Sequence, residues 1–183
     1  MKKIVCLWGG PGTGKSTTCA GLFSKLKALG YNAEMNREYI KDWVWEKRNV
    51  IPGDQIYITA KQARKEVIYM RNNMDFIITD SPLALTTFYG NIYDKYETEH
   101  GACKAIVRQH HAICKDLGYK IDHFFLVRTK PYNPAGRNQD EETAREYDTR
   151  IKKFLDEYPV NYKVVNCDEN AEDNIIKELL REG

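Results

Sequence analysis

The sequence predicts an α/β protein in which helices cover both faces of a parallel β-sheet. Short β-prone runs alternate along the chain with longer segments that suit helices, which is the pattern of β-α-β units. One of these runs, residues 76–79, has no charged face, as expected for a strand in the middle of a parallel sheet. We therefore expect five parallel strands in a three-layer α/β/α arrangement.

Length and composition favour one domain spanning residues 1–183. The chain has 183 residues, of which 42% are hydrophobic and 30% charged, and its net charge of +2 leaves only a local basic groove as a route to nucleic acid. Its five cysteines are scattered without a C-x-x-C pair, and the apolar run 4–8 is too short for a signal peptide or a membrane span. We expect a cytoplasmic protein with free thiols and no contact with membranes, and the sequence carries no signal of oligomeric state.

The elements of the first half are separated by clear breaks. Gly30 is a natural helix stop, and Pro52 and Gly53 interrupt the chain before a long segment whose apolar residues lie on one helical face. The elements expected here are strand 4–8, helix 16–29, strand 31–35, helix 36–48, helix 54–73 and strand 76–79.

The second half continues the alternation. Asp140 is a suitable N-cap for a helix, and the segment RTKPYNPAGRNQ (128–139), with two prolines, a glycine and no periodicity, is expected to be a loop. The elements expected here are helices 83–96 and 98–117, strand 122–127, helix 140–158, strand 162–165 and helix 171–180.

Three segments are expected to meet at one edge of the sheet. In parallel sheets covered by helices, ligands bind beyond the carboxyl ends of the strands. Residues 9–16, 80–82 and 128–139 each follow a predicted strand, so the chemistry is predicted at this edge.

The segment GGPGTGKS (9–16) matches the pattern G-x-x-x-x-G-K-[ST] between a predicted strand and a predicted helix. In such a loop, backbone N–H groups and the helix N-terminus bind phosphate, the lysine reaches the β- and γ-phosphates, and the serine hydroxyl ligates Mg²⁺. We therefore predict a site for ATP (or GTP) with Mg²⁺. The residues predicted to bind the nucleotide are Gly10, Gly12, Thr13, Gly14, Lys15, Ser16 and Thr17.

Asp80 ends the strand expected beside the first strand. A carboxylate there can accept a proton from an attacking hydroxyl or, together with Ser16, hold Mg²⁺. The simpler interpretation is that Asp80 caps the helix after Pro82. Its position at a strand end favours the catalytic or metal-binding role.

The loop after the strand 122–127 is interpreted as a basic lid over residues 128–140. It carries Arg128, Lys130 and Arg137, and we predict that Arg128 and Arg137 stabilise charge on the transferred phosphoryl group. The alternative is an ordinary solvated loop. Arg145 and Arg150 follow on a helix rich in glutamate, where surface ion pairs are expected.

The acceptor is expected to approach from the side opposite ATP. Arg37, Glu38 and Tyr39 follow the second strand, where Arg37 can orient an acceptor and Glu38 can act as a base or bind a hydroxyl; an exposed first helical turn is the alternative. Gln62 can bond the edge of a base, whereas Trp43 and Trp45 are expected to serve packing.

The segments GGPGTGKSTT, NREYI, IITDSP and RTKPYNPAGRNQ resemble a group of P-loop kinases that includes the nicotinamide riboside kinase domain and related AAA-type ATP-binding proteins of bacteria and phages. The resemblance covers most of the chain and implies a nucleoside-kinase-like fold with ATP and Mg²⁺ on one side and a hydroxyl acceptor on the other. It implies nucleosides, nucleotides or, for phage enzymes, hydroxymethylated bases or ends in DNA as acceptors. TDSP (79–82) departs from the Asp-Arg-Ser signature of many deoxynucleoside kinases.

Three functions follow from these observations. The first is transfer of the γ-phosphate to a nucleoside- or nucleotide-type hydroxyl. The second is a DNA-modifying kinase, acting on a base such as 5-hydroxymethyluracil or on a 5′ end, and the third is a nucleotide-dependent switch or ATPase. Seven cations of the acceptor half favour the second function unless they form a solvated helical face: Lys41, Lys47, Arg48, Lys61, Arg64, Lys65 and Arg71.

Overall fold

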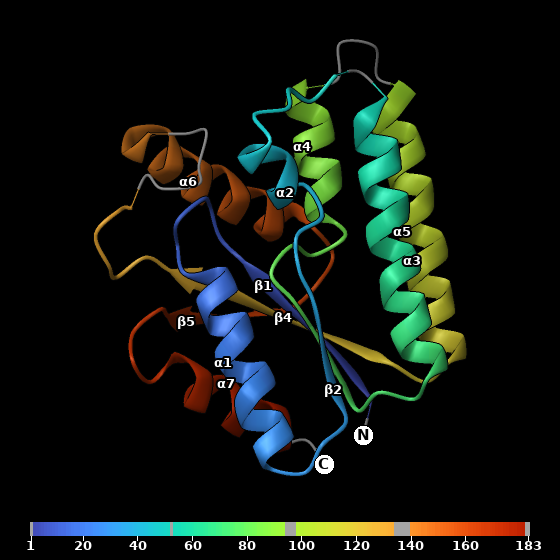
Figure 1. Ribbon diagram of the computed structural model, residues 1–183, viewed down its shortest axis with the longest axis vertical. Coiled ribbons are helices and arrows are strands. Elements are labelled where there is room, and N and C mark those ends of the chain that lie inside the picture. The colour runs from blue at the N-terminus through green and yellow to red at the C-terminus, as the bar shows by residue number, and fades with distance from the viewer. Residues whose placement is uncertain (1, 52, 94–97, 134–139, 182–183) are drawn as a thin grey trace.

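The computed structural model describes residues 2–51, 53–93, 98–133 and 140–181, and it contains a five-stranded sheet (Figure 1). The strand order is β2-β3-β1-β4-β5, and every neighbouring pair is parallel. The predicted fold class is therefore confirmed. The strands are β1 (Lys3–Trp8), β2 (Ala33–Asn36), β3 (Phe76–Thr79), β4 (Lys120–Val127) and β5 (Tyr162–Asn166).

Helices cover both faces of this sheet (Figure 1). Side chains of α1 and α7 pack with one face, and side chains of α3, α4, α5 and α6 pack with the other. The helices are α1 (Lys15–Ala28), α2 (Lys41–Trp45), α3 (Asp54–Arg71), α4 (Leu85–Tyr93), α5 (Thr98–Asp116), α6 (Glu141–Glu157) and α7 (Ala171–Arg181).

The predicted helix 36–48 is wrong in its first part. Asn36 ends β2 instead, with a fully buried side chain whose Nδ2 donates to Glu66 Oε1 at 2.9 Å. This long-range hydrogen bond and the pairing of β2 with β3 outweigh the local helical pattern, so only Lys41–Trp45 is helical. Trp43 packs in the interior as expected, whereas Trp45 is 63% exposed.

The remaining breaks follow the local chemistry of the sequence. Gly30 has a φ of +90°, which suits the residue that ends a helix, and Asp140 caps α6 by accepting the N–H of Thr143 at 2.8 Å. All five cysteines are buried free thiols. No helix in the described part of the chain is both long enough and apolar enough to span a membrane.

Candidate active site

The loop between β1 and α1 has the backbone conformation of a phosphate cradle. Gly9, Gly12 and Gly14 have φ values of +146°, +75° and +109°, a region that side-chain-bearing residues rarely occupy. Gly14 is the N-cap of α1 and offers no side chain to its first turn. The positive end of the helix is therefore left for an anionic ligand, as the sequence motif predicts.

Lys15 folds back over this loop. Its Nζ donates to the carbonyl oxygens of Gly9 at 2.7 Å and Gly10 at 2.9 Å. Burial lowers the pKa of Lys15 below its usual 10.5, while the negative charges of Glu38 and Asp80 act in the opposite direction. These interactions bring the lysine and two acidic side chains from separate strand ends into one site.

Asp80 lies at the end of β3 and is only 2% exposed. Its Oδ1 accepts the backbone N–H of Glu38 at 2.8 Å, which joins the ends of β2 and β3. The Asp80 carboxylate therefore accepts its hydrogen bond from Glu38 and not from the helix after Pro82. This argues against the interpretation of Asp80 as a helix cap. Burial raises the pKa of Glu38 above its usual 4.5, although the charge of Lys15 opposes this.

Arg128, from the start of the predicted lid, contacts the phosphate loop directly. Its Nη2 donates to the carbonyl oxygen of Pro11 at 2.8 Å, and both Nε and Nη2 lie 2.9 Å from Asp148 Oδ2. Lys130 is exposed, and Arg137 lies outside the described residues. Arg128 and the phosphate loop are thus brought together as predicted from the sheet topology.

Asp148 was missed by sequence reasoning. It sits on α6 in no recognisable motif, yet its Oδ1 accepts the N–H of Gly10 at 2.6 Å and the hydroxyl of Thr13 at 3.2 Å. Only its spacing of about one helical turn from Ala144 and from Ile151, which are apolar and buried, could have indicated that it faces inward.

The other predicted nucleotide residues lie along the same turn. Thr13 is buried and donates to Gly10 O at 2.6 Å, so it stabilises the loop from inside. Ser16 and Thr17 are exposed at the start of α1, where a ligand can reach their hydroxyls.

The residues predicted to bind the acceptor have different surroundings in the structure. Glu38 is half-buried beside Asp80, whereas Arg37 is exposed. Tyr39 Oη lies 3.0 Å from Tyr57 Oη, so its hydroxyl pairs with α3. Gln62 is 2% exposed, and its Nε2 donates to the carbonyl oxygen of Ser81, so it supports the segment after Asp80.

A buried charged pair lies behind the acceptor side. Glu66 Oε2 on α3 is 2.8 Å from His110 Nε2 on α5, and Glu66 Oε1 accepts Asn36 Nδ2. Burial alone would lower the pKa of His110, but hydrogen bonds to Cys114 and Glu66 and the charge of Glu66 raise it to about 10. The histidine is therefore charged at neutral pH, which anchors α3 to α5.

The fold and the phosphate loop together define a P-loop nucleotide-binding protein of the α/β class. The chain belongs to a family described as AAA domain, whose model matches residues 4–173.

Three known proteins are similar to this chain. A putative adenylate kinase of Thermoplasma volcanium is 46% identical over 43 residues, which is 24% of this chain and 26% of that protein, so the match spans about a quarter of each. The crystal structure of NadR protein in complex with NR superposes with a TM-score of 0.64 at 17% identity, covering 96% of this chain and 51% of that chain. The Mycobacterium tuberculosis APS kinase CysC matches with a TM-score of 0.48 at 17% identity, covering 98% of this chain and 95% of that chain. The predicted resemblance to AAA-type ATP-binding proteins is confirmed by the family model, and the likeness to the NadR structure confirms the fold.

Proposed function

We propose that the chain is an ATP- or GTP-dependent, Mg²⁺-dependent kinase that transfers the γ-phosphate to a hydroxyl group of a nucleoside- or nucleotide-type acceptor. The observation that carries this proposal is the convergence of Lys15, Glu38 and Asp80 from three adjacent strand ends. A phosphate-binding lysine beside two carboxylates is the arrangement that phosphoryl transfer to a hydroxyl needs.

The residues at the loop fit a magnesium–nucleotide complex. The uncapped first turn of α1 offers backbone donors to phosphate, and Ser16 and Asp80 offer the hard oxygen atoms that Mg²⁺ prefers. When bound, Mg²⁺ would neutralise charge on the β- and γ-phosphates. Lys15 then exchanges its two carbonyl acceptors for phosphate oxygens, which are stronger partners for an ammonium group.

Glu38 is the better candidate for the base. Its pKa is raised by burial, and a base is most effective when its pKa approaches the working pH. In this assignment Glu38 accepts the proton of the attacking hydroxyl while a new P–O bond forms to the acceptor and the bond to the nucleoside diphosphate breaks. Arg128, whose charge also acts on Lys15, stabilises the charge on the transferred group.

The test is transfer of label from γ-labelled ATP and GTP with Mg²⁺ to a panel of nucleosides and mononucleotides, with Lys15→Ala as the blank. Lys15-dependent label on one panel member supports the proposal. Rapid Lys15-dependent release of free phosphate without labelled acceptor would instead support the nucleotide-dependent switch or ATPase.

A second candidate function, a kinase whose acceptor is polymeric DNA, is favoured by the charge pattern of α3. Lys61, Arg64, Lys65 and Arg71 are exposed, and none forms an ion pair with a carboxylate among the described residues. The one glutamate of this helix, Glu66, is buried against His110. All exposed charged residues of α3 after its first turn are thus basic, as on polyanion-binding surfaces, and exposed apolar residues such as Ile68 lie between them.

An aromatic cluster lies at the N-terminal end of this basic surface. The rings of Trp43 and Tyr57 are stacked at 14° with centroids 6.4 Å apart, and Tyr39 packs edge-on against both. The Arg48 guanidinium lies 3.5 Å from the centroid of Trp43, and Lys61 lies over Tyr57. Trp43 is covered by Tyr57 and Arg48, so Tyr57, which is 45% exposed, is the ring of this cluster on which an unstacked base can lie.

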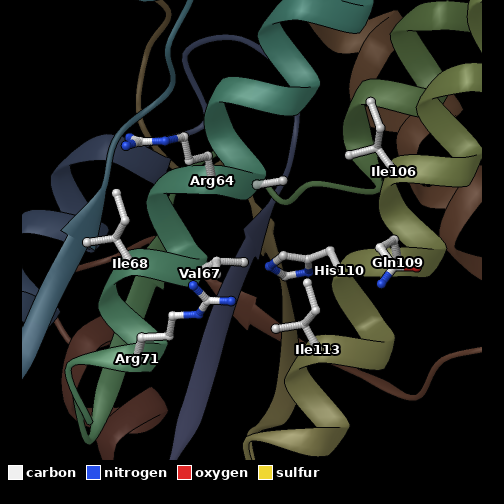
Figure 2. Close-up of a pocket in the computed structure, with 9 residues that line it drawn as sticks. Arg64, Val67, Ile68, Arg71, Ile106, Gln109, His110 and Ile113 are labelled. Carbon is white, nitrogen blue, oxygen red and sulfur yellow. The ribbon is translucent and has the colours of Figure 1, made fainter.

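Farther along α3, the basic surface borders a pocket of about 400 Å³ between α3 and α5. Figure 2 shows Arg64, Ile68 and Arg71 on α3 and His110 and Ile113 on α5 around this pocket. The cations and the aromatic cluster together extend from the side of Glu38 along the length of α3.

DNA with ordinary or hydroxymethylated pyrimidines, added to the same transfer panel, tests the second candidate. Label on DNA and a steep loss of transfer with added salt would support it. Label confined to small molecules would exclude it.

A further inference from the structure

Asp148 joins the phosphate loop to Arg128 through both of its carboxylate oxygens. Oδ1 accepts from Gly10 N and Thr13 Oγ1, and Oδ2 accepts from Nε of Arg128 and lies in ion-pair contact with its Nη2. The carboxylate is 20% exposed and the Arg128 side chain 6% exposed, so both ends of this ion pair are largely shielded from water. Such partly buried, charge-assisted bonds restrict the positions of both partners.

The packing around Gly10 makes this junction rigid. A Cβ atom at Gly10 would lie 2.5 Å from Asp148 Oδ1 and 2.8 Å from the carbonyl oxygen of Ala144. Helix α6 therefore lies directly against the backbone of the phosphate loop. A displacement of α6 would move the loop and Arg128 together.

One side of the Arg128 guanidinium remains unused. Nε and Nη2 bind Asp148 and Pro11, but Nη1 is buried and has no hydrogen-bond partner among the described residues. A buried charged donor without an acceptor is costly, and an anion is the partner that it lacks. The charge of Arg128 also acts on Lys15, which places the guanidinium within electrostatic range of the phosphate-binding lysine.

We propose that Asp148 is a positioning residue of the nucleotide site: it holds the phosphate loop in its curled form and orients Arg128 so that Nη1 binds a phosphate oxygen of the nucleoside triphosphate. This inference rests on the proposed function, because it takes the phosphate loop as the triphosphate site. It assigns Arg128 to nucleotide binding and gives α6 a role in that site.

The test measures the affinity of the full chain for ATP with Mg²⁺ by titration calorimetry, which needs no acceptor. Asp148→Asn removes the charge that orients Arg128, and we expect it to weaken ATP binding by about tenfold or more, the effect of losing a hydrogen bond to a charged group. Glu146→Gln is the matched control, because Glu146 lies on the same helix and also pairs with an arginine, Arg150, but at the exposed surface. It should bind ATP as the unchanged protein does.

Two further variants separate positioning from a loss of structure. In an Arg128→Gln background, Asp148→Asn should weaken ATP binding by less than about twofold, because the amide oxygen of Asn still accepts from Gly10 N and the orientation of Arg128 is already lost. Asp148→Glu retains a carboxylate and should bind ATP more tightly than Asp148→Asn. If Asp148→Asn lowers the melting temperature strongly, Arg128→Lys, which leaves the loop contacts of Asp148 in place, should still weaken binding.

Unchanged or tighter ATP binding by a folded Asp148→Asn variant would overturn the inference. The carboxylate would then either have no effect on ATP binding or compete with phosphate for the loop. Lys15→Ala distinguishes a failure of this inference from a failure of the proposed function. If Lys15→Ala weakens ATP binding and Asp148→Asn does not, only this inference fails. If Lys15→Ala has no effect on ATP binding, the proposed function fails with it.

Discussion

Helices α3 and α6 pack on the same face of the sheet, but their charged residues have different partners. On α6, three cations each pair with a carboxylate four residues away: Arg145 with Glu141, Arg150 with Glu146 and Lys152 with Asp156. On α3, the exposed cations have no such partners in the described part of the chain. The same residue types are therefore neutralised on one helix and available to a ligand on the other.

The inward-facing residues of the two helices differ as well. Asp148 of α6 contacts the phosphate loop, whereas Gln62 and Glu66 of α3 support Ser81 and Asn36 on the acceptor side. We infer that α6 serves the nucleotide side of the site and α3 the acceptor side. Substitutions on the two sides should therefore separate nucleotide binding from phosphate transfer.

The largest expected effect is on the nucleotide side. Lys15→Ala should lower phosphate transfer by about a thousandfold or more and weaken ATP binding, because the charge that contacts the phosphates is lost. Lys25→Ala is the matched control, since Lys25 lies on the same helix and pairs with Asp173 at the surface. Equal losses in both variants, measured by label transfer and calorimetry, would contradict the assignment.

On the acceptor side, Glu38→Gln should reduce transfer by about a hundredfold, the lower end of the range for losing a general base, while ATP binding changes only a few-fold. Because burial raises the pKa of Glu38, protonation should reduce transfer as the pH falls, with a midpoint above the usual 4.5. The pH profile of transfer measures this midpoint. A midpoint at or below 4.5, or parallel losses of binding and transfer, would remove Glu38 as the base.

The buried pair that anchors α3 should govern stability. His110→Ala leaves Glu66 buried without its partner and should lower the free energy of unfolding by about 3 kcal/mol. The folded-state pKa of His110 is raised from 6.5 to about 10, so its contribution is fully present below pH 6.5 and is lost as the pH rises towards 10. Urea unfolding of both proteins at several pH values tests this prediction. If the free energy of unfolding of the unchanged protein varies with pH in the same way as that of His110→Ala, the pair does not govern stability.

The smallest expected effect belongs to the surface of α3. If DNA is the acceptor, Arg64→Gln and Lys65→Gln together should weaken DNA binding several-fold and lower its salt dependence by about two counterions, without changing ATP binding. Arg145→Gln and Arg150→Gln on α6 provide the matched control. Equal effects of the two double variants would show that the difference in ion pairing between the helices has no bearing on DNA.

The sequence predicts the nucleotide side better than the acceptor side. Gly9–Ser16 could be identified because a phosphate cradle is built from consecutive residues with local backbone requirements. Asp148 and Glu66 could not, because their roles depend on partners 138 and 30 residues away in the chain. The error at Asn36 has the same origin, since a distant carboxylate and a neighbouring strand determine its conformation.

The most direct test of the central claim is transfer from γ-labelled ATP, with Mg²⁺, to the combined panel of nucleosides, mononucleotides and DNA, comparing the unchanged chain with Lys15→Ala and Glu38→Gln. The account predicts label on an acceptor that requires both residues, with ATP binding retained in Glu38→Gln. Lys15-dependent ATP hydrolysis with no labelled acceptor, and no effect of Glu38→Gln, would contradict it.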